Sequence, residues 1–328
     1  MILDKALLDK IDYLSQRLDE RKLDILVGLA MDNLVQEAAM YAPIQDVDNE
    51  LRKDEVTKAY AEAWDFARSS YHGQFNFLFL GEVAGRVSPD LTKDNQKYLE
   101  WRKGSVNLRG ISYKPPIDES RIINQLERLE QVIKDQPLHH AEEALLLNFH
   151  LTRIQPFDNG NKRTSSIMMN LMLRYNNLPP IYITPSERFT YISLLQSALE
   201  GFQERSCQVT DPLEAFYIPD YQQRGYYDYL GQKIINNLVL AEDKLKQYPL
   251  FEIDLTAKEV GVYFKVKKEI DGHLRHNGKP HQVRLFRNEK NRIQIVGEVS
   301  LQSLEQILRK NKGVTSFSIE CKRINGDH

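Results

Sequence analysis

The apolar positions in the first part of the chain recur at helical spacing. Residues 1–70 place apolar side chains every three or four positions among mixed charges, and residues 73–87 form another apolar run of helix length. Residues 118–135 carry six apolar side chains on one stripe. Such spacing gathers apolar side chains on one face of a helix. The pattern therefore predicts a mainly helical protein.

Three later segments are the strongest candidates for core helices. Residues 139–154 are apolar almost all round, and residues 164–175 repeat apolar positions at i, i+3, i+4, i+7, i+8 and i+11. A helix that is apolar on most sides is buried on most sides. Residues 184–202 begin with Thr184 and Glu187 at the spacing of a capping box. These helices are expected to form the centre of one large domain.

Two parts of the chain show the alternation that is typical of strands. Residues 104–116 alternate Val106, Leu108 and Ile111 with polar positions and end in two prolines, which predicts a short β-hairpin. A connecting helix is predicted at 226–247. The segments that follow alternate or are rich in β-branched residues, which predicts strands at 261–270, 281–287, 292–299 and 315–324. A helix at 300–313 lies among them, so this part is predicted to be a small α+β domain.

These patterns predict the following organisation. N-terminal helices occupy residues 1–60, a mainly helical domain 61–220, a helical connector 221–250 and an α+β domain 251–328. The chain has 328 residues, of which 41% are hydrophobic and 27% charged, as in ordinary globular proteins. No apolar run approaches the length of a membrane span.

The two cysteines, Cys207 and Cys321, lie far apart, and the first residues lack the pattern of a secretory signal. We therefore expect a cytoplasmic protein with free thiols. A secreted effector without an N-terminal signal stays open as an alternative. The sequence predicts no oligomeric state.

Charge is unevenly distributed along the chain. Residues 255–328 hold fifteen Lys and Arg against eight Asp and Glu, although the whole chain has a net charge of −2. A basic segment is compatible with an acidic partner, with nucleic acid or with a solvated surface. Residues of a nucleic-acid face would be basic or aromatic, namely Lys265, Lys267, Lys268, Arg275, Arg284, Arg287, Arg292, Tyr263 and Phe286.

The polar turn between the two apolar helices is the most informative stretch. It reads RIQPFDNGNKRTSS from residue 153 to residue 166. A helix start exposes unpaired amides and carries partial positive charge, so cations are unfavourable there. Lys162 and Arg163 nevertheless occupy the first helical turn, and Gly160 allows a ligand to approach the backbone. This combination predicts an anion site, and a phosphate group is the anion that it favours.

The turn resembles the active-site loop of the Fic and Doc family, whose pattern is I-H-P-F-x-[D/E]-G-N-[G/K]-R. Residues 100–116, 139–154 and 187–201 also resemble the family's flap, its preceding core helix and its downstream helix. The resemblance covers about residues 60–217. It implies a helical Fic-type fold with a β-hairpin flap.

The resemblance also implies an activity. Most family members transfer AMP from ATP to a hydroxyl of a target protein, and the Doc-like branch transfers a phosphoryl group. Phosphate binding falls on Gly160, Asn161, Lys162 and Arg163. The flap, which carries Val106, Asn107, Leu108 and Arg109, is expected to bind a segment of the target protein as an added strand.

Three positions depart from the family pattern. Gln155 replaces the histidine that takes the proton of the attacking hydroxyl, and glutamine has no titratable group. Asn159 replaces the acidic magnesium ligand, so Mg²⁺ binding is expected to be weak or absent, with Asp158 as an alternative ligand. Ser166 replaces a second arginine of the phosphate clamp. His150 is an alternative base, one turn before the loop.

Many family members also have an inhibitory helix with the pattern Ser-x-x-x-Glu followed by Gly or Asn. Residues 27–41 are the candidate, with Gln36 at the position of the glutamate and Glu37 next to it. Two hypotheses remain. The first is a pseudoenzyme or regulator that binds ATP or another nucleotide, and the second is a divergent AMP-transferase or other phosphate-group transferase.

Overall fold

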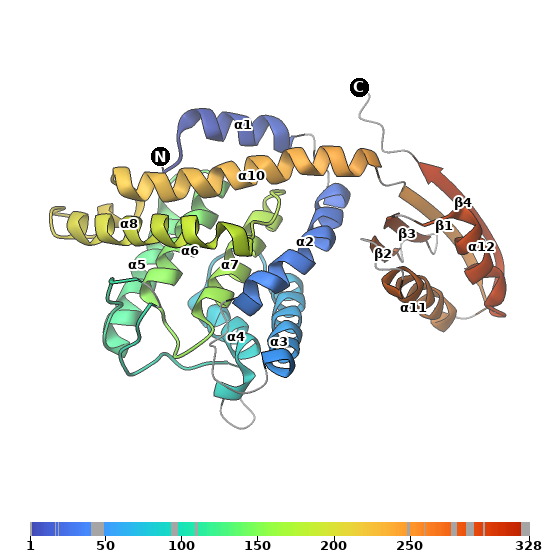
Figure 1. Ribbon diagram of the computed structural model, residues 1–328, viewed down its shortest axis with the longest axis horizontal. Helices are drawn as coiled ribbons and strands as arrows, with labels where there is room; N and C mark the ends of the chain where they lie inside the picture. The colour runs from blue at the N-terminus through green and yellow to red at the C-terminus, as the bar shows by residue number, and fades with distance from the viewer. Residues whose placement is uncertain are drawn as a thin grey trace. The chain divides into compact units, whose positions relative to one another are not determined.

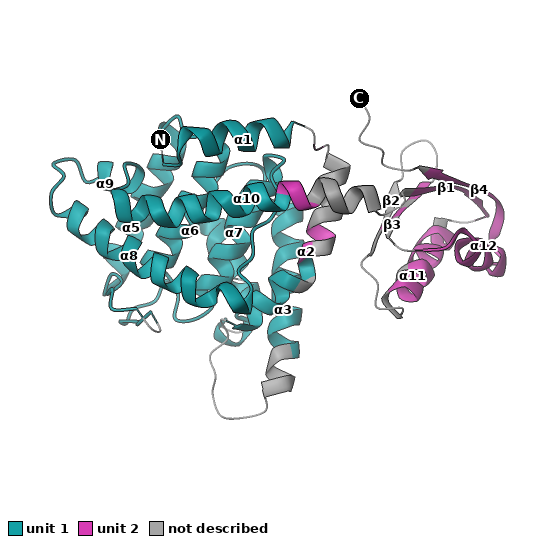
Figure 2. Ribbon diagram, turned by 45° about the horizontal axis from the view of Figure 1, so that its top comes forward, with its two compact units in different colours: residues 1–17, 31–237 teal, residues 18–30, 238–328 magenta. Residues whose placement is uncertain are grey.

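The structure is a computed structural model that describes residues 2–16, 18, 20–40, 49–92, 98–108, 111–247, 250–258, 260–276, 281–286, 292–297 and 299–322. It divides into two compact units, coloured teal and magenta in Figure 2. Unit 1 comprises residues 1–17 and 31–237, and unit 2 comprises residues 18–30 and 238–328.

Unit 1 is helical, as the sequence predicts (Figure 1). Two of its helices, α2 and α10, continue across the boundary into unit 2. The helices, with two short 3-10 segments η1 and η2, are α1 (Lys5–Ser15), α2 (Glu20–Met40), α3 (Asn49–Ser70), α4 (Phe77–Val87), η1 (Pro89–Leu91), α5 (Glu119–Asp135), α6 (His140–Ile154), α7 (Asn161–Tyr175), η2 (Pro185–Glu187), α8 (Arg188–Ser206), α9 (Glu214–Tyr217) and α10 (Tyr221–Gln247).

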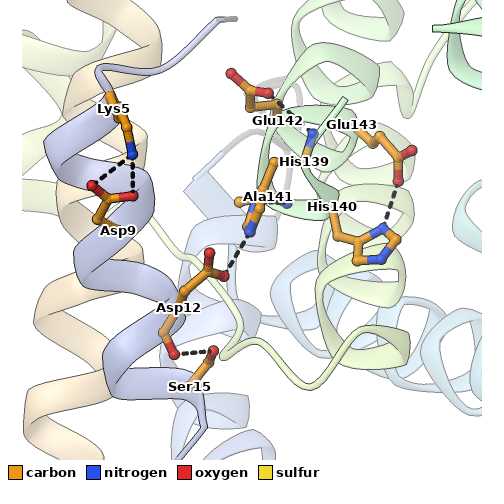
Figure 3. Close-up of polar contacts among 9 residues, drawn as sticks. All are labelled: Lys5, Asp9, Asp12, Ser15, His139, His140, Ala141, Glu142 and Glu143. Carbon is orange, nitrogen blue, oxygen red and sulfur yellow. Dashed lines mark hydrogen bonds and ion pairs between the residues drawn. The ribbon is translucent and has the colours of Figure 1, made fainter. Parts of the chain in front are cut away.

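Helices α6 and α7 pack against each other at the centre of this unit. Nearly every side chain of both is buried, which confirms the expectation of two core helices. In Figure 3, Glu142 reaches back to the backbone N–H of His139 at the start of α6. The same carboxylate accepts hydrogen bonds from the amides of Ile2 and Leu3. The imidazole of His139 contacts Asp12 of α1 at 2.8 Å. These contacts fix α1 to the start of α6.

The capped start that the sequence predicts at residue 184 is confirmed. The carboxylate of Glu187 accepts hydrogen bonds from the backbone N–H of Thr184 at 2.9 Å and from its hydroxyl at 2.7 Å. A single turn of 3-10 helix precedes α8 there.

The predicted hairpin at 104–116 is wrong in its strands. Residues 104–108 and 111–116 form no strand in the structure, whereas Arg109 and Gly110 lie outside the described residues. The chain does reverse direction, because the amide of Ile111 donates to the carbonyl of Leu108 at 3.1 Å. A side-chain bond from Lys114 to Asn107 closes the turn further out. The sequence thus predicted the reversal of the chain correctly, but the described residues on its two sides form no strand pair.

Unit 2 contains a four-stranded antiparallel sheet in the order β2-β3-β1-β4. Its elements follow the order β-α-β-β-α-β, which is the split βαβ arrangement. They are β1 (Leu250–Ala257), α11 (Val260–His276), β2 (His281–Phe286), β3 (Arg292–Gly297), α12 (Leu301–Lys310) and β4 (Val314–Lys322). Apolar side chains from β1, β2, β3, α11 and α12 share one core.

One predicted strand of unit 2 is wrong, because residues 261–270 belong to helix α11. Its buried side chains are Tyr263, Val266, Ile270 and Leu274, at the three- and four-residue spacing of a helix. The apparent alternation of apolar residues before Lys267 is also compatible with that spacing. The apolar face of the sheet must be buried against another element, and helix α11 provides that contact.

The expectation that Lys265 and Lys267 share one strand face is wrong, because they lie two residues apart on helix α11. Lys265 and Lys268 are both exposed and lie three residues apart on that helix, and nucleic-acid binding stays a prediction. The ring of Tyr263 is buried, and its hydroxyl donates to the carbonyl of Leu255. Arg292 is paired with Asp254 and Glu252. The side chains of Arg275, Arg284 and Phe286, and the whole of Arg287, lie outside the described residues.

Within the part of the chain that the structure describes, no helix is both long and apolar enough to cross a membrane.

Candidate functional site

The loop between α6 and α7 is held in an unusual backbone conformation. Gln155 ends α6 with φ 50° and ψ 61°, and Gly160 precedes α7 with φ 78°. Positive φ is uncommon for a residue with a side chain. The side chain of Asn161 closes the loop, since its amide oxygen accepts from the backbone of Phe157 at 2.9 Å and its amide nitrogen donates back at 2.6 Å. Asn161 therefore shapes the loop through its side chain.

Gln155 turns its side chain back toward α6. Its amide nitrogen donates to the carbonyl of Thr152 at 2.7 Å, and the residue is 7% exposed. The side chain thus serves as a cap for the last turn of the helix. An amide neither gains nor loses a proton in water, so this position supplies orientation but no general base.

Arg102 is a second anchor of the loop, and sequence reasoning missed it. Its side chain is 1% exposed and donates to the carbonyls of Ile154 and Gln155. It also donates to the carbonyls of Gly104 and Pro116, at the two ends of the turn segment. The last carbonyls of a helix need such partners. No local sequence signal marks this arginine, because its four acceptors belong to segment 104–116 and to the end of α6.

The contacts of Arg102 place the two ends of the flap segment 104–116 relative to the loop. Leu108 is buried, Val106 is half-buried and Asn107 is exposed, whereas Arg109 lies outside the described residues. Because Arg102 binds both ends of segment 104–116, this segment begins and ends beside the loop. The adjacent Trp101 stacks on Phe157 with 5.2 Å between ring centroids. The flap segment and the loop therefore share one support.

The two cations of the loop occupy different environments. Arg163 is buried, and one of its terminal nitrogens donates to the carbonyl of Val87 at 3.1 Å. Lys162 is half-buried, and its pKa falls to about 8 because burial disfavours the ammonium and Arg188 repels it, against an opposing attraction from Glu37. A second positive charge so close to a partly buried lysine favours a bound anion.

The candidate metal ligands lie at the rim of the loop. Asn159 is half-buried, and its amide oxygen accepts from the backbone N–H of Gly160 at 2.7 Å. Asp158 is exposed. Burial lowers the pKa of Arg102, and the negative charge of Asp158 opposes this shift in part. Among the described residues, no group of three or more His, Cys, Asp and Glu could hold a metal ion. An amide oxygen is a weak Mg²⁺ ligand, so a metal at Asn159 would depend on the phosphates of a bound nucleotide.

His150 does not serve as an alternative base. Its ring is fully buried between Phe149, Phe202 and Phe216. One ring nitrogen contacts the carbonyl of Phe216 at 3.0 Å, and the other accepts from Arg153 at 3.2 Å. Burial holds its pKa well below the ordinary range. Both nitrogens are engaged away from the loop.

A buried carboxylate from α2 lies near the first turns of α7. Glu37 is 6% exposed, and burial raises its pKa to about 8, against contacts with the Ile183 backbone, Lys233 and Ser166 that lower it. Gln36, the residue that the sequence favoured for this place, is exposed, whereas the adjacent Glu37 is buried.

Ser88 is a further neighbour of the loop that sequence reasoning missed. It ends α4 and is 1% exposed. A Cβ added to Gly160 would lie only 2.5 Å from its hydroxyl oxygen. Glycine is therefore needed at position 160 for the close approach of Ser88 as well as for its positive φ.

Comparison with known proteins agrees with this geometry. Residues 83–173 match the model of the Fic/DOC family, and this stretch includes α6, the loop and α7 up to residue 173. A protein adenylyltransferase Fic from Drosophila sechellia is 32% identical over 102 residues, which are 31% of this chain and 21% of that protein. The chain thus matches about a fifth of the length of its curated relatives. The resemblance to the Fic and Doc family is confirmed over this stretch.

Two solved structures share the fold. A Fic-domain-containing signaling protein from Bacteroides thetaiotaomicron has a TM-score of 0.53 at 18% identity, covering 72% of this chain and 94% of that chain. A Fic-1 structure from C. elegans has a TM-score of 0.51 at 15% identity, covering 74% of this chain and 72% of that chain. The protein has a Fic-type fold and is related to protein adenylyltransferases.

Proposed function

We propose that this protein, whose residues 83–173 match the Fic/DOC family, binds a nucleotide by its phosphates and acts as a pseudoenzyme or regulator. The observation that carries the proposal is Gln155, whose side chain caps its own helix at the position of the family's proton acceptor.

The phosphate site of this proposal is the start of α7. Gly160 has no side chain to keep a ligand away from the backbone. Asn161 holds the loop closed, and Lys162 and Arg163 supply positive charge. Amides in the first helical turn have no intrahelical acceptor, and they favour an anion together with the helix dipole. The preferred ligand is ATP or another nucleotide, because tetrahedral phosphate matches such a cradle.

The chemical step is the part that is proposed to be lost. General base catalysis contributes typically about 10²–10⁴-fold to rate. Gln155 cannot supply it, and His150 is enclosed in the core. Neither Asn159 nor Asp158 offers a buried carboxylate to Mg²⁺. We infer nucleotide binding with weak or absent dependence on Mg²⁺.

The partner of this proposal is a protein segment bound beside the loop. Segment 104–116 has no strand of its own among the described residues, and Arg102 ties its ends to the loop. A target strand would contact Val106, Asn107, Leu108 and Arg109. We propose that Glu37 takes the role of the family's inhibitory glutamate, with the hydroxyl of Ser166 as its partner in place of an arginine.

A second candidate is a divergent AMP-transferase or other phosphate-group transferase. The lowered pKa of Lys162, about 8, favours it, because a neutral amine beside the cradle can accept a proton. This reaction would show a rate that rises with pH toward the pKa of Lys162.

ATP labelled on its α-phosphate separates the two candidates. Isothermal titration calorimetry should show ATP binding by the parent and loss of binding in Arg163→Ala. The parent should transfer no label to protein, whereas Gln155→His with Asn159→Asp should gain transfer.

Two results would count against the pseudoenzyme. Label transfer by the parent that disappears in Lys162→Met, while that variant still binds ATP, would favour the second candidate. Absence of ATP binding at millimolar concentration would remove both.

A further inference from the structure

A buried hydroxyl without a hydrogen-bond partner lies beside the start of α7. It belongs to Ser88, whose side-chain oxygen is buried and unpartnered and lies against Gly160. Ser88 comes from the end of α4, a different element from the loop. Buried polar groups are nearly always paired in native proteins, and exceptions need an explanation.

The backbone of Ser88 does not explain its hydroxyl. Its amide donates to the carbonyl of Ala84 at 2.9 Å, and its carbonyl accepts from Leu91 at 3.1 Å. Both backbone groups are therefore satisfied at the junction between α4 and η1. Only the hydroxyl is left, and it lies against Gly160, at the place where any other residue would put its Cβ.

The neighbouring residue ties the same junction to the loop. The carbonyl of Val87 accepts a hydrogen bond from the side chain of Arg163. Two neighbouring residues therefore contact the loop and α7: the carbonyl of Val87 binds Arg163, and the hydroxyl of Ser88 lies against Gly160. The position of Ser88 is thus set by contacts outside the sequence motif of the loop.

We propose that Ser88 is a ligand of the phosphate site and donates its hydroxyl proton to an oxygen of a phosphate bound at the start of α7. The proposal rests on the proposed function, since it names an additional contact in the same site. A hydroxyl suits this role because it donates to an anion without adding charge beside Lys162 and Arg163.

The arrangement predicts opposite effects in the free and bound protein. Without ligand, Ser88→Ala removes a buried hydroxyl that has no partner, so stability stays the same or rises. With ligand, the same change removes a hydrogen bond to a charged group and leaves a phosphate oxygen without its donor. A residue that only supports the fold would show the reverse.

The experiment compares Ser88→Ala with the parent by calorimetry with ATP and with inorganic phosphate, and by thermal unfolding without ligand. We expect affinity for both ligands to fall about tenfold or more, as for loss of a hydrogen bond to a charged group. The midpoint of unfolding without ligand should not fall.

Tyr227→Phe is the matched control. It removes another buried hydroxyl that lacks a partner, on α10. The control should leave both affinities unchanged.

The possible outcomes are separable. If the parent binds both ligands and Ser88→Ala binds them equally well, the assignment of Ser88 is overturned while the proposed function stands. A lower midpoint in Ser88→Ala at unchanged affinity overturns it as well, because Ser88 would then support the fold. If the parent binds neither ligand at millimolar concentration, the proposed function fails, and the role of Ser88 fails with it.

Discussion

Replacing Glu37 by glutamine should change how the stability of unit 1 depends on pH. The carboxyl group is buried, and its pKa is raised to about 8 from an ordinary value of 4.5, mainly by burial. Glutamine has nearly the same shape but carries no titratable group. The comparison therefore isolates the proton of Glu37.

The sign follows from the two pKa values. Between about pH 4.5 and 8, the folded protein keeps the proton on Glu37, whereas the unfolded chain releases it. Stability falls with rising pH wherever the folded state binds more protons. The slope approaches about 1.4 kcal/mol per pH unit. From pH 5 to 7.5, Glu37 should lower the free energy of unfolding by about 3 kcal/mol. Lys162 remains protonated over most of this range, because its pKa is about 8.

Urea unfolding followed by tryptophan fluorescence is a suitable assay. The protein has two tryptophans, Trp64 and Trp101, and both belong to unit 1. The signal thus reports unit 1 without a contribution from unit 2. The parent, Glu37→Gln and Gln36→Glu should be measured at pH 5, 6.5 and 7.5. Gln36 is exposed, so a carboxylate there controls for added charge on the same helix.

The expected result is a stability difference between Glu37→Gln and the parent that grows by about 3 kcal/mol from pH 5 to 7.5 in favour of the variant. Gln36→Glu should follow the parent at every pH. A constant difference between Glu37→Gln and the parent would refute the reasoning, since Glu37 would then have the same pKa in both states.

Three further predictions follow from the site and from unit 2. Asn159→Asp should make ATP binding depend on Mg²⁺, while Asp158→Ala should not change it, as calorimetry with and without the metal would test; a strong dependence in the parent that Asp158→Ala abolishes would contradict this assignment. Arg102→Met should lower the free energy of unfolding of unit 1 by at least about 3 kcal/mol, because four carbonyls, two of them in buried hydrogen bonds, lose their donor, whereas Lys103→Met, at an exposed position, should have no effect in the same urea assay. Gly272→Ala should stabilise unit 2 by about 0.5–1 kcal/mol, since this helical glycine has open space for a Cβ. Hydrogen exchange would measure the change, and a loss of stability would count against helix α11.

Periodicity in the sequence was sufficient to predict most of the helices. Helix α6 was predicted because apolar side chains cover nearly its whole surface, and α7 because its apolar positions recur at helical spacing. Residues 261–270 were assigned wrongly, since their short apolar run fits a strand as well as a helix. Segment 104–116 alternates like a strand but finds no strand partner among the described residues. In both cases the neighbours in space, absent from local sequence, decide the outcome.

The sequence by itself determined the loop: its glycine, its two cations and the loss of histidine at Gln155 are all local features. The tertiary structure decided what surrounds that loop. It places Glu37, and not Gln36, in the interior, because the rotation of α2 about its axis is set by packing. It brings Arg102 to four carbonyls and Ser88 to Gly160 from distant positions in the chain. Burial and hydrogen bonding between distant segments arise only when the chain is folded, so no local pattern of residues encodes them.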